Sequence, residues 1–423
     1  MIGVVTVAVL ARLAVVGPKL GRVADDPDNY VDLARSLRVD HSYAIRGRPT
    51  AYRPPLYPLL LAPLIGPSEP EPRSDGLPWA TTRMNAGIAI LHLLLGAGAA
   101  LLTAVAARRF GLPDGRVLLA GLIVALDPVL VVQAQAIMTE TLAAFLIAWA
   151  IAAAARGRPS GAAETGFALG LAALCRPSTL AGSAFCVACA ACAGPGVRRE
   201  RFARATLIVA TMAVTIAPWA VRNRLVLGEF VWTTTHGGYT LALANNPDYY
   251  RDVLNGPPGA VWDAGLQRSW AERIAKETAG LPEPDADRLL ARSGWLMLRD
   301  HPRDFLRASL ARLGRLWAIQ PSSAVYGWKV RWLSAAWAIP LFTLVILGLL
   351  RRRAWRWPEC ILPAFLMGIT CVHFTYWSDM RMRAPVVPAI ALAAASMSVG
   401  RGKKKGNNLE STRVYVVGRA WIG

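Results

Sequence analysis

The sequence predicts an all-α membrane protein, a polytopic helical bundle of about 10 transmembrane helices with two long extracytoplasmic loops that contain interfacial helices. Three observations support this fold class. Only 17% of the 423 residues are charged and 54% are hydrophobic, whereas a soluble chain has about 25% charged residues. Long apolar runs recur along the chain, and basic residues gather between them. A disordered chain, a fibre and a disulfide-stapled mini-domain are therefore excluded.

The apolar runs mark the expected spans. Ten of them are long enough, or nearly so, to cross about 30 Å of hydrocarbon. They lie at 1–16, 84–107, 117–134, 137–155, 162–175, 178–195, 205–221, 333–350, 358–376 and 384–399. These spans divide the chain into an N-terminal membrane module, an extracytoplasmic loop, C-terminal membrane helices and a cytoplasmic tail. The four parts are residues 1–221 (with a first outer loop at 17–82), 222–332, 333–399 and 400–423. Because the first span begins abruptly at Met1, we expect the natural start to lie upstream.

Basic residues set the topology. They cluster in alternate short connections, whereas the intervening short connections have few and both long loops are nearly neutral. The clusters are Arg108, Arg109 and Arg116; Arg156 and Arg158; Arg198, Arg199, Arg201 and Arg204; Arg351, Arg352, Arg353 and Arg356; and Arg401, Lys403, Lys404 and Lys405. By the positive-inside rule these connections and both termini face the cytoplasm, and the long loops lie outside. The net charge of +20 is thus largely a topology signal, and no nucleic-acid partner is expected.

The first outer loop begins with three carboxylates. Asp25, Asp26 and Asp28 stand where an amphipathic helix is expected from Pro27 onward, with Asp25 or Asp26 as its N-cap. Capping and solvation alone would explain one of them. Alternatively, a partly desolvated carboxylate at the membrane surface has a raised pKa and can act as a general base.

The stretch 51–64 follows in the same loop. It is apolar but too short and too rich in proline to span, so it predicts a helix in the membrane interface with Tyr52 and Tyr57 at headgroup level. Arg53 beside it suits a lipid phosphate. The alternative for Arg53 is simple snorkelling toward the headgroups.

Further charged residues occupy the outer ends of the spans. Asp127 and Glu140 interrupt a long apolar region, where a carboxylate is costly and usually functional, although Asp127 before Pro128 could simply end a helix. Arginines recur at the same level, and His236 is the histidine in a turn-like outer segment. Nucleotide-binding and hydrolase motifs are absent from the sequence. A carboxylate cluster and an arginine cluster on one face suit a reaction at a charged phospholipid, with the energised donor borne by the lipid.

At this point the chain resembles the C-type superfamily of polytopic glycosyltransferases, in particular the bacterial relatives of protein O-mannosyltransferases and of lipid A aminoarabinose transferase. The motifs that carry the resemblance occur in family order over about residues 1–390. They are Asp26-x-x-x-Tyr30, Arg53-Pro54-Pro55-Leu56-Tyr57-Pro58, Thr139-Glu140-Thr141, Arg176-Pro177, Pro218-Trp219-x-x-Arg222-Asn223, Gly237-Gly238, Asn245-Asn246-Pro247 and Asp379-x-Arg381-x-Arg383. Each motif is weak alone, and the ordered set is more specific.

The resemblance implies a hexosyl- or pentosyltransferase in the bacterial cytoplasmic membrane. Such an enzyme moves a sugar from a polyprenyl-phosphate donor to an acceptor lipid, glycan or protein at the outer face. Asp26 falls on the family's acidic position and is expected to be the general base. Glu140 falls on the second acidic position and is expected to be the second catalytic residue, which orients the acceptor or the sugar. The expected substrate-binding residues are Tyr30, Arg53, Tyr57, Arg176, Asn223, His236, Arg381 and Arg383.

Two points stay open at this stage. No metal ligand is assigned, but a divalent cation held by Asp26 and Glu140 is one option, and no basic residue stands next to Glu140 in the sequence. The alternative function is a transporter or flippase for a lipid-linked or anionic substrate. That alternative would use the same arginines but should have broken helices or pseudo-symmetric halves, which the sequence does not indicate.

Overall fold

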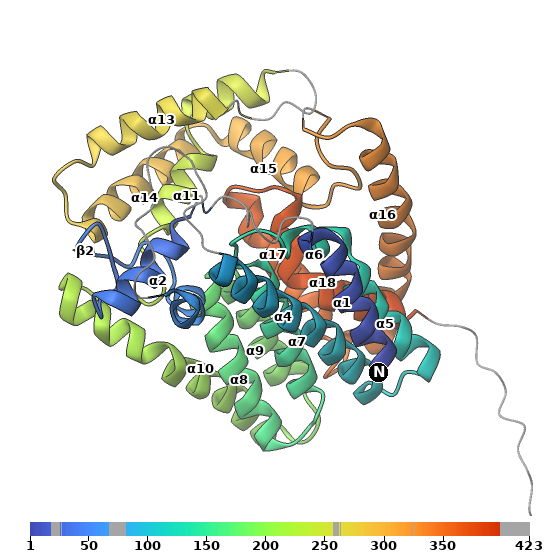
Figure 1. Cartoon of the computed structure of the whole chain (residues 1–423). Helices are drawn as coiled ribbons and strands as arrows, with labels where there is room; N and C mark the ends of the chain where they lie inside the picture. Colours follow the sequence, from blue (N-terminus) through green and yellow to red (C-terminus); the bar gives the residue numbers. More distant parts are fainter. Residues whose placement is uncertain are drawn as a thin grey trace, which may run out of the picture.

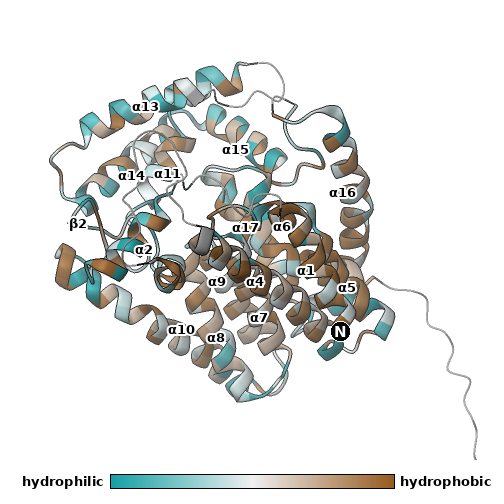
Figure 2. Cartoon of the chain, viewed as in Figure 1, coloured by the Kyte–Doolittle hydropathy of each residue, from teal (hydrophilic) through white to brown (hydrophobic). Residues whose placement is uncertain are grey.

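The computed structural model describes residues 1–17, 26, 28–66, 82–256, 262, 264–323 and 325–397. The described chain is almost entirely helical. A bundle of apolar helices forms one layer, and a second layer of more polar helices covers one end of it (Figure 1). Figure 2 shows the contrast, with brown helices in the bundle and more teal on α13 and α14. Asp25 and the tail 400–423 lie outside the described residues.

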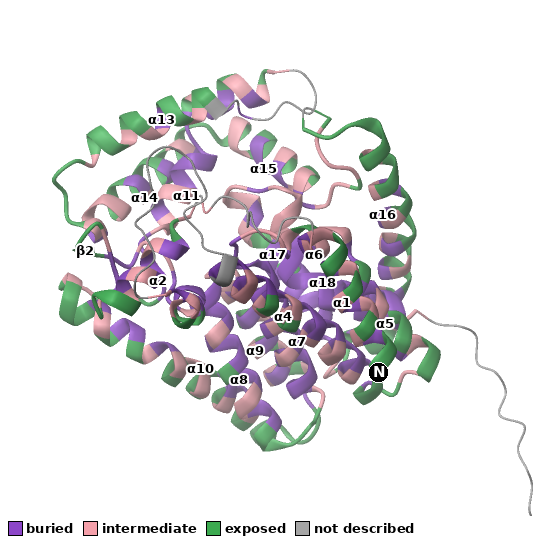
Figure 3. Ribbon diagram, viewed as in Figure 1, coloured by how far each residue is buried: buried purple, intermediate pink, exposed green. Residues whose placement is uncertain are grey.

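Ten helices of the described part of the chain make up the bundle. They are α1 (Ile2–Val16), α4 (Thr82–Arg109), α5 (Asp114–Leu126), α7 (Glu140–Ala154), α8 (Pro159–Cys175), α9 (Thr179–Ala193), α10 (Arg198–Leu227), α16 (Trp328–Leu349), α17 (Ile361–Thr375) and α18 (Val387–Ala395). Helix α7 lies between α4 and α8 and is buried on nearly all sides, which explains its unbroken apolar sequence (Figure 3). Every expected span coincides at least in part with one of these helices.

Length and composition qualify three described helices to cross a membrane. They are α4 over Met84–Arg109, α10 and α16. Helices α1, α7, α9 and α17 are equally apolar but have 10–17 residues. An all-α bundle is therefore confirmed, whereas the number of about 10 transmembrane helices remains a proposal.

The expected span at 117–134 is wrong as a single helix. Helix α5 ends at Leu126, and α6 (Pro128–Gln133) starts anew with Asp127 as its N-cap. The Asp127 carboxylate accepts hydrogen bonds from the backbone N–H groups of Val129 and Leu130, both at 3.1 Å. A residue before proline is pushed out of the helical region, which accounts for the break. The last expected span, 384–399, likewise begins in a 3-10 segment, η5 (Met380–Val386), before α18.

The buried Arg12 stabilises this break. Its guanidinium donates to the carbonyl oxygens of Ala125 (3.0 Å) and Val124 (3.3 Å), which end α5. A cation at a helix C-terminus compensates the partial negative charge there. Gly96 of α4 makes room for Arg12, because a Cβ at that position would stand 2.1 Å from Arg12 Nε.

The two long loops, 17–82 and 222–332, are called the first and second outer loop after the side on which they are expected. The described part of the first contains α2 (Tyr30–Val39), a small antiparallel pair β1 (Ala44–Ile45) and β2 (Arg48–Pro49), α3 (Leu56–Leu61) and η2 (Ala62–Leu64). The expected amphipathic helix starts at Tyr30 rather than Pro27, because Asn29 adopts a left-handed conformation with φ 57°. Helix α3 covers part of the expected interfacial stretch. Its Leu59 is half exposed, but Tyr57, expected at headgroup level, is fully buried inside the protein.

The second outer loop contains α11 (Gly237–Ala244), α12 (Pro247–Tyr249), a π-helical turn η3 (Tyr250–Leu254), α13 (Ala264–Glu277), α14 (Glu283–Asp300) and α15 (Pro302–Leu316). An aromatic core that includes Tyr249, Trp262 and Trp270 packs these helices together. On the opposite side, a 3-10 turn η4 (Arg352–Trp355) joins α16 to α17.

The two outer loops are fastened to each other. The Glu283 carboxylate at the start of α14 accepts hydrogen bonds from Thr50 Oγ1 (2.6 Å) and from the backbone N–H of Ala51 (2.7 Å). It also accepts one from the Thr235 hydroxyl, and the Thr235 N–H donates to the Ala51 carbonyl at 3.0 Å. Residues of both loops are thereby held against each other near Arg53 and His236.

Candidate active site

A cavity of about 740 Å³ lies where the two outer loops meet the ends of the bundle helices. Its wall combines residues from the first outer loop, the α7 and α8 ends, the second outer loop and η5. Five of the residues expected from the sequence line it: Tyr30, Arg53, Arg176, His236 and Arg381. Residues that are far apart in the chain thus form one site.

Arg53 forms the loop side of the cavity. Its Nη2 lies 2.6 Å from Asp28 Oδ1, and both side chains are partly exposed. The guanidinium also lies over the rings of Tyr52 (5.1 Å) and Tyr30 (5.9 Å). Ring faces attract cations, so these rings hold the guanidinium in place while leaving it able to bind an anion.

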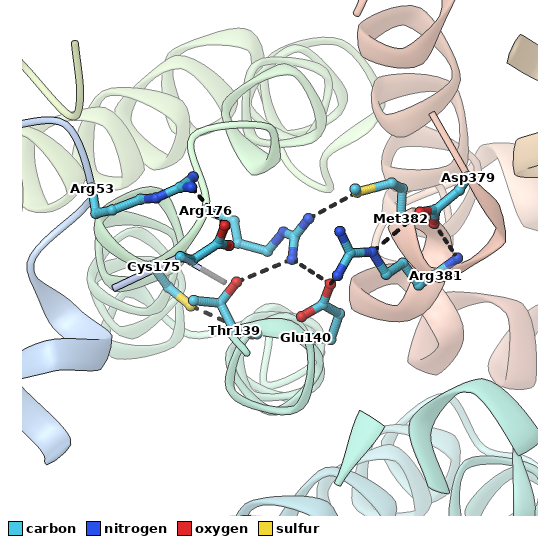
Figure 4. A network of polar contacts seen from close by, with 9 residues as sticks. Arg53, Thr139, Glu140, Cys175, Arg176, Asp379, Arg381 and Met382 are labelled. Atoms are coloured by element: carbon cyan, nitrogen blue, oxygen red, sulfur yellow. Dashed lines mark hydrogen bonds and ion pairs between the residues drawn. The ribbon is translucent and has the colours of Figure 1, made fainter. Parts of the chain in front are cut away.

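Arg176 and Arg381 form the bundle side, and Glu140 holds them. Glu140 is the first residue of α7 and is fully buried, and its Oε1 lies 2.9 Å from Arg176 Nη1 and 4.0 Å from Arg381 Nη1 (Figure 4). Arg176 also donates to Thr139 Oγ1 and to Met382 Sδ, both at 3.0 Å. The basic partners that are missing beside Glu140 in the sequence therefore come from other helices.

Asp26 is placed differently from Asp28. Its carboxylate accepts hydrogen bonds from the N–H groups of Tyr30 (3.0 Å) and Val31 (2.7 Å) in the first turn of α2. The N-cap residue itself is Asn29, so the expectation of Asp25 or Asp26 at the N-cap position is wrong. Burial raises the pKa of Asp26 to about 6, although these hydrogen bonds lower it and Asp28 and Asp32 add to the rise. Asp28 lines the cavity, whereas Asp26 lies just behind the lining at Tyr30.

Three expected substrate-binding residues lie outside the cavity lining. Tyr57 is buried and hydrogen-bonds His92 Nε2 at 2.8 Å. Asn223 donates to the Val231 carbonyl at 2.8 Å, and Arg383 donates to the carbonyls of Leu316 and Ala318. In this arrangement all three side chains make contacts within the protein that support the surrounding loops.

Several lining residues were not proposed from the sequence as substrate contacts. They include Tyr52, Thr139, Tyr239, His373 and Trp377. The sequence gives little reason to expect most of them at a substrate site, because an aromatic residue in an outer loop is ordinarily a core or interface residue. His373 offered a clearer signal, since a histidine inside an apolar run usually faces a partner or a polar cavity.

His236 stays neutral at this site. Burial, and then the positive charge of Arg53, lower the pKa of His236 well below its usual range. Its ring stacks on Tyr239 with centroids 5.2 Å apart, and Tyr52 meets it edge-on at 4.3 Å. Three aromatic rings therefore form one continuous patch of the cavity wall, which we call the aromatic wall (Tyr52, His236 and Tyr239).

The donor set does not suit a divalent cation held by Asp26 and Glu140. Asp26 is engaged by backbone N–H groups, and Glu140 is paired with two arginines. Among the described residues, no group of three or more His, Cys, Asp or Glu side chains could hold a metal ion. Because a cation would meet guanidinium groups there, no step is assigned to one.

The comparisons confirm the predicted resemblance to protein O-mannosyltransferases over part of the chain. Residues 24–176 match the sequence family "Dolichyl-phosphate-mannose-protein mannosyltransferase". This segment contains Asp26, Arg53, Glu140 and Arg176.

A solved structure agrees in fold with this chain. The apo oligosaccharyltransferase of Archaeoglobus fulgidus matches with a TM-score of 0.50 and 14% identity, over 93% of this chain and 50% of that one. ArnT from Cupriavidus metallidurans, solved bound to undecaprenyl phosphate, gives a TM-score of 0.40 and 15% identity, over 93% and 77% of the two chains. The chain spans about half the length of the archaeal enzyme. A comparison with the curated proteins finds no match.

Proposed function

We propose that the chain is a membrane glycosyltransferase that moves a sugar from a polyprenyl-phosphate donor to an acceptor hydroxyl at the outer face of the bacterial cytoplasmic membrane. One observation carries this proposal: Arg53, Arg176 and Arg381 line a single cavity closed by both outer loops. A guanidinium binds phosphate oxygens bidentately and stays charged at any relevant pH. The match to the mannosyltransferase family over 24–176 supports the same reaction class.

The reaction is a displacement at the anomeric carbon of the donor sugar. The acceptor oxygen forms a bond to that carbon, and the bond from the carbon to the phosphate oxygen breaks. The electron pair stays on the departing polyprenyl phosphate, whose charge the arginines stabilise, and the acceptor proton passes to a carboxylate base. Glu140 holds Arg176 and Arg381 toward the cavity in this mechanism.

Asp26 is the proposed base. It is the family's acidic position, and a pKa near 6 leaves its carboxylate ionised at pH 7 but able to accept a proton. Asp28 is the second candidate, because it lines the cavity itself. Asp26→Asn and Asp28→Asn separate the two, since asparagine has nearly the same size as aspartate but cannot take the proton.

We expect turnover to collapse in Asp26→Asn, while folding and donor binding survive and Asp28→Asn stays within a few-fold of the parent protein. Collapse in Asp28→Asn, with near-normal Asp26→Asn, would move the base to Asp28. Full turnover in both variants would remove the carboxylate-base mechanism.

The function itself is tested by incubating the purified full chain with a radiolabelled polyprenyl-phosphate sugar and a membrane extract as acceptor source. Release of free polyprenyl phosphate together with labelled product is expected. Movement of the intact donor across a reconstituted vesicle, with no release of polyprenyl phosphate, would instead indicate a flippase.

The outward-facing site follows from the proposed topology and can be tested by cysteine labelling. In a variant without native cysteines, Ser269→Cys on exposed α13 should react in intact cells with a membrane-impermeant thiol reagent. Ser160→Cys lies at an exposed position at the start of α8, next to the basic connection that contains Arg158 and is expected in the cytoplasm. It should react only after lysis. The reverse pattern would invert the topology.

A further inference from the structure

We propose that the aromatic wall (Tyr52, His236 and Tyr239) is the subsite for the donor's sugar ring, and that it selects an uncharged, hydroxyl-rich sugar over an amino sugar. This inference rests on the proposed function and deepens it by naming the class of sugar. All three residues belong to the two long loops rather than to the helices of the bundle.

The position of the subsite follows from covalent connectivity. In a polyprenyl-phosphate sugar, a single oxygen separates the phosphorus from the anomeric carbon. A wall next to a phosphate-binding arginine is therefore within reach of the sugar. Tyr52 precedes Arg53 in the chain, and the Arg53 guanidinium lies 5.1 Å from the Tyr52 ring centroid. His236 and Tyr239 continue the same wall by ring contacts.

The surface of the subsite suits a sugar. Pockets that bind small molecules combine apolar and aromatic walls with a few well-placed polar groups. Here the rings offer flat surfaces to the C–H groups of a pyranose. Trp270 packs behind Tyr239 with centroids 5.5 Å apart and keeps that ring in place. Gln267 and Thr240, which also line the cavity, add hydrogen-bonding groups near the wall.

His236 is the polar centre of the wall. Its Nδ1 is buried and has no hydrogen-bond partner among the described residues. A buried polar atom without a partner is unfavourable, and a sugar hydroxyl, which both donates and accepts, can complete it with either ring tautomer. An ammonium group can only donate, so it fits fewer of these arrangements.

The positive charge of the cavity also disfavours an amino sugar at the aromatic wall. Arg53, Arg176 and Arg381 all line the cavity, whereas Asp28, the one acidic residue among the described lining residues, is already paired with Arg53. The donor phosphate would neutralise part of this positive charge. Because every donor carries the same phosphate, this effect does not distinguish a neutral sugar from a cationic one. A cationic sugar therefore meets repulsion that a neutral sugar avoids.

The experiment compares two donors that differ by one group. One is undecaprenyl phosphate carrying glucose, and the other carries 2-amino-2-deoxyglucose. Sugar-free undecaprenyl phosphate is the reference. Binding to the purified full chain is measured for all three. We expect the glucosyl donor to bind better than the sugar-free lipid and at least about tenfold better than the amino donor. Equal or tighter binding of the amino donor would overturn the selectivity.

His236→Phe tests the subsite itself, because phenylalanine keeps the stacked ring and removes both nitrogen atoms. The variant should lose about tenfold in affinity for the glucosyl donor and bind sugar-free undecaprenyl phosphate as the parent protein does. His301→Phe, an exposed position between α14 and α15, is the matched control and should change neither affinity.

The outcomes separate this inference from the proposed function. An unchanged preference for the glucosyl donor in His236→Phe would remove the sugar subsite from this wall, even if the chain transfers sugars. Absence of transfer from every donor would contradict the proposed function, while the binding comparison would still decide where the sugar ring lies.

Discussion

Two carboxylate–arginine pairs border the cavity, one in the first outer loop and one between bundle helices. Asp28 and Arg53 lie 2.6 Å apart with 22% and 15% of their side chains exposed. Glu140 and Arg176 lie 2.9 Å apart with 0% and 14% exposed. The chemistry of the pairs is the same, but only the loop pair has both partners at the cavity surface.

Their backbone settings differ as well. Glu140 begins α7 and Arg176 directly follows α8, so each charge faces the helix end whose partial charge is opposite. The bundle pair is therefore fixed by two helix termini, burial and Thr139. The loop pair is held by one contact and two aromatic rings. From this difference we expect that Glu140 keeps Arg176 in a fixed position facing the cavity, whereas Arg53 can exchange Asp28 for a ligand phosphate.

The largest effect is expected from breaking the bundle pair. Glu140→Gln leaves Arg176 without its charged partner in a buried position, which typically costs about 3–5 kcal/mol of stability. Activity should be lost, and the midpoint of thermal unfolding should fall clearly. Asp114→Asn, which breaks the highly exposed pair with Arg108, is the control and should leave both unchanged.

The double variant Glu140→Gln/Arg176→Gln sharpens this expectation. Because it removes both charges, it should regain part of the lost stability without regaining activity. Equal stability of Glu140→Gln and the parent protein would mean that the buried Glu140–Arg176 pair contributes no more to stability than the Asp28–Arg53 pair.

A smaller but clear effect is expected at the loop pair. Arg53→Ala removes the cation proposed to bind the donor phosphate and should weaken donor binding by about 1.5–3 kcal/mol, the size of a charge-assisted hydrogen bond. Thermal stability should change little. Arg48→Ala, exposed in the same loop, is the matched control. Unchanged donor affinity in Arg53→Ala would mean that Arg53 does not bind the donor phosphate and only snorkels toward the headgroups.

The pH dependence of turnover probes the base beside the loop pair. A base must be ionised to accept a proton, and the pKa of Asp26 is raised to about 6 by burial. The value of kcat/KM should therefore level off above pH 7 and fall about tenfold per pH unit well below pH 6. A profile that stays flat down to pH 5 would exclude Asp26 as the base.

The smallest effect is expected from Asp28→Asn, if Asp28 only competes with phosphate for Arg53. Freeing the guanidinium should tighten donor binding a few-fold, as measured with sugar-free undecaprenyl phosphate. Weaker binding in this variant would mean that Asp28 orients Arg53 rather than competing with its ligand.

Much of the bundle could be predicted from local sequence, because a helix in an apolar layer must satisfy its backbone internally and bury an apolar surface. Local sequence patterns did not predict the helix ends correctly where a side chain changes the direction of the backbone. Asp127 and Pro128 split one expected span, and Asn29 with the Asp26 cap moved the start of α2. The Asp26 carboxylate still accepts hydrogen bonds from the first N–H groups of α2, although Asn29 occupies the N-cap position.

The sequence alone thus determined the fold class, the expected sidedness and the residue types of the site, since hydropathy, arginine asymmetry and motif order are local properties of the chain. Only the tertiary structure decided which charges meet. Glu140 finds Arg176 and Arg381, and Arg53 finds Asp28, through contacts between separate elements. The aromatic wall is likewise assembled from two loops joined by Glu283. Such pairings depend on how helices pack and loops cross, and no periodicity within one segment encodes them.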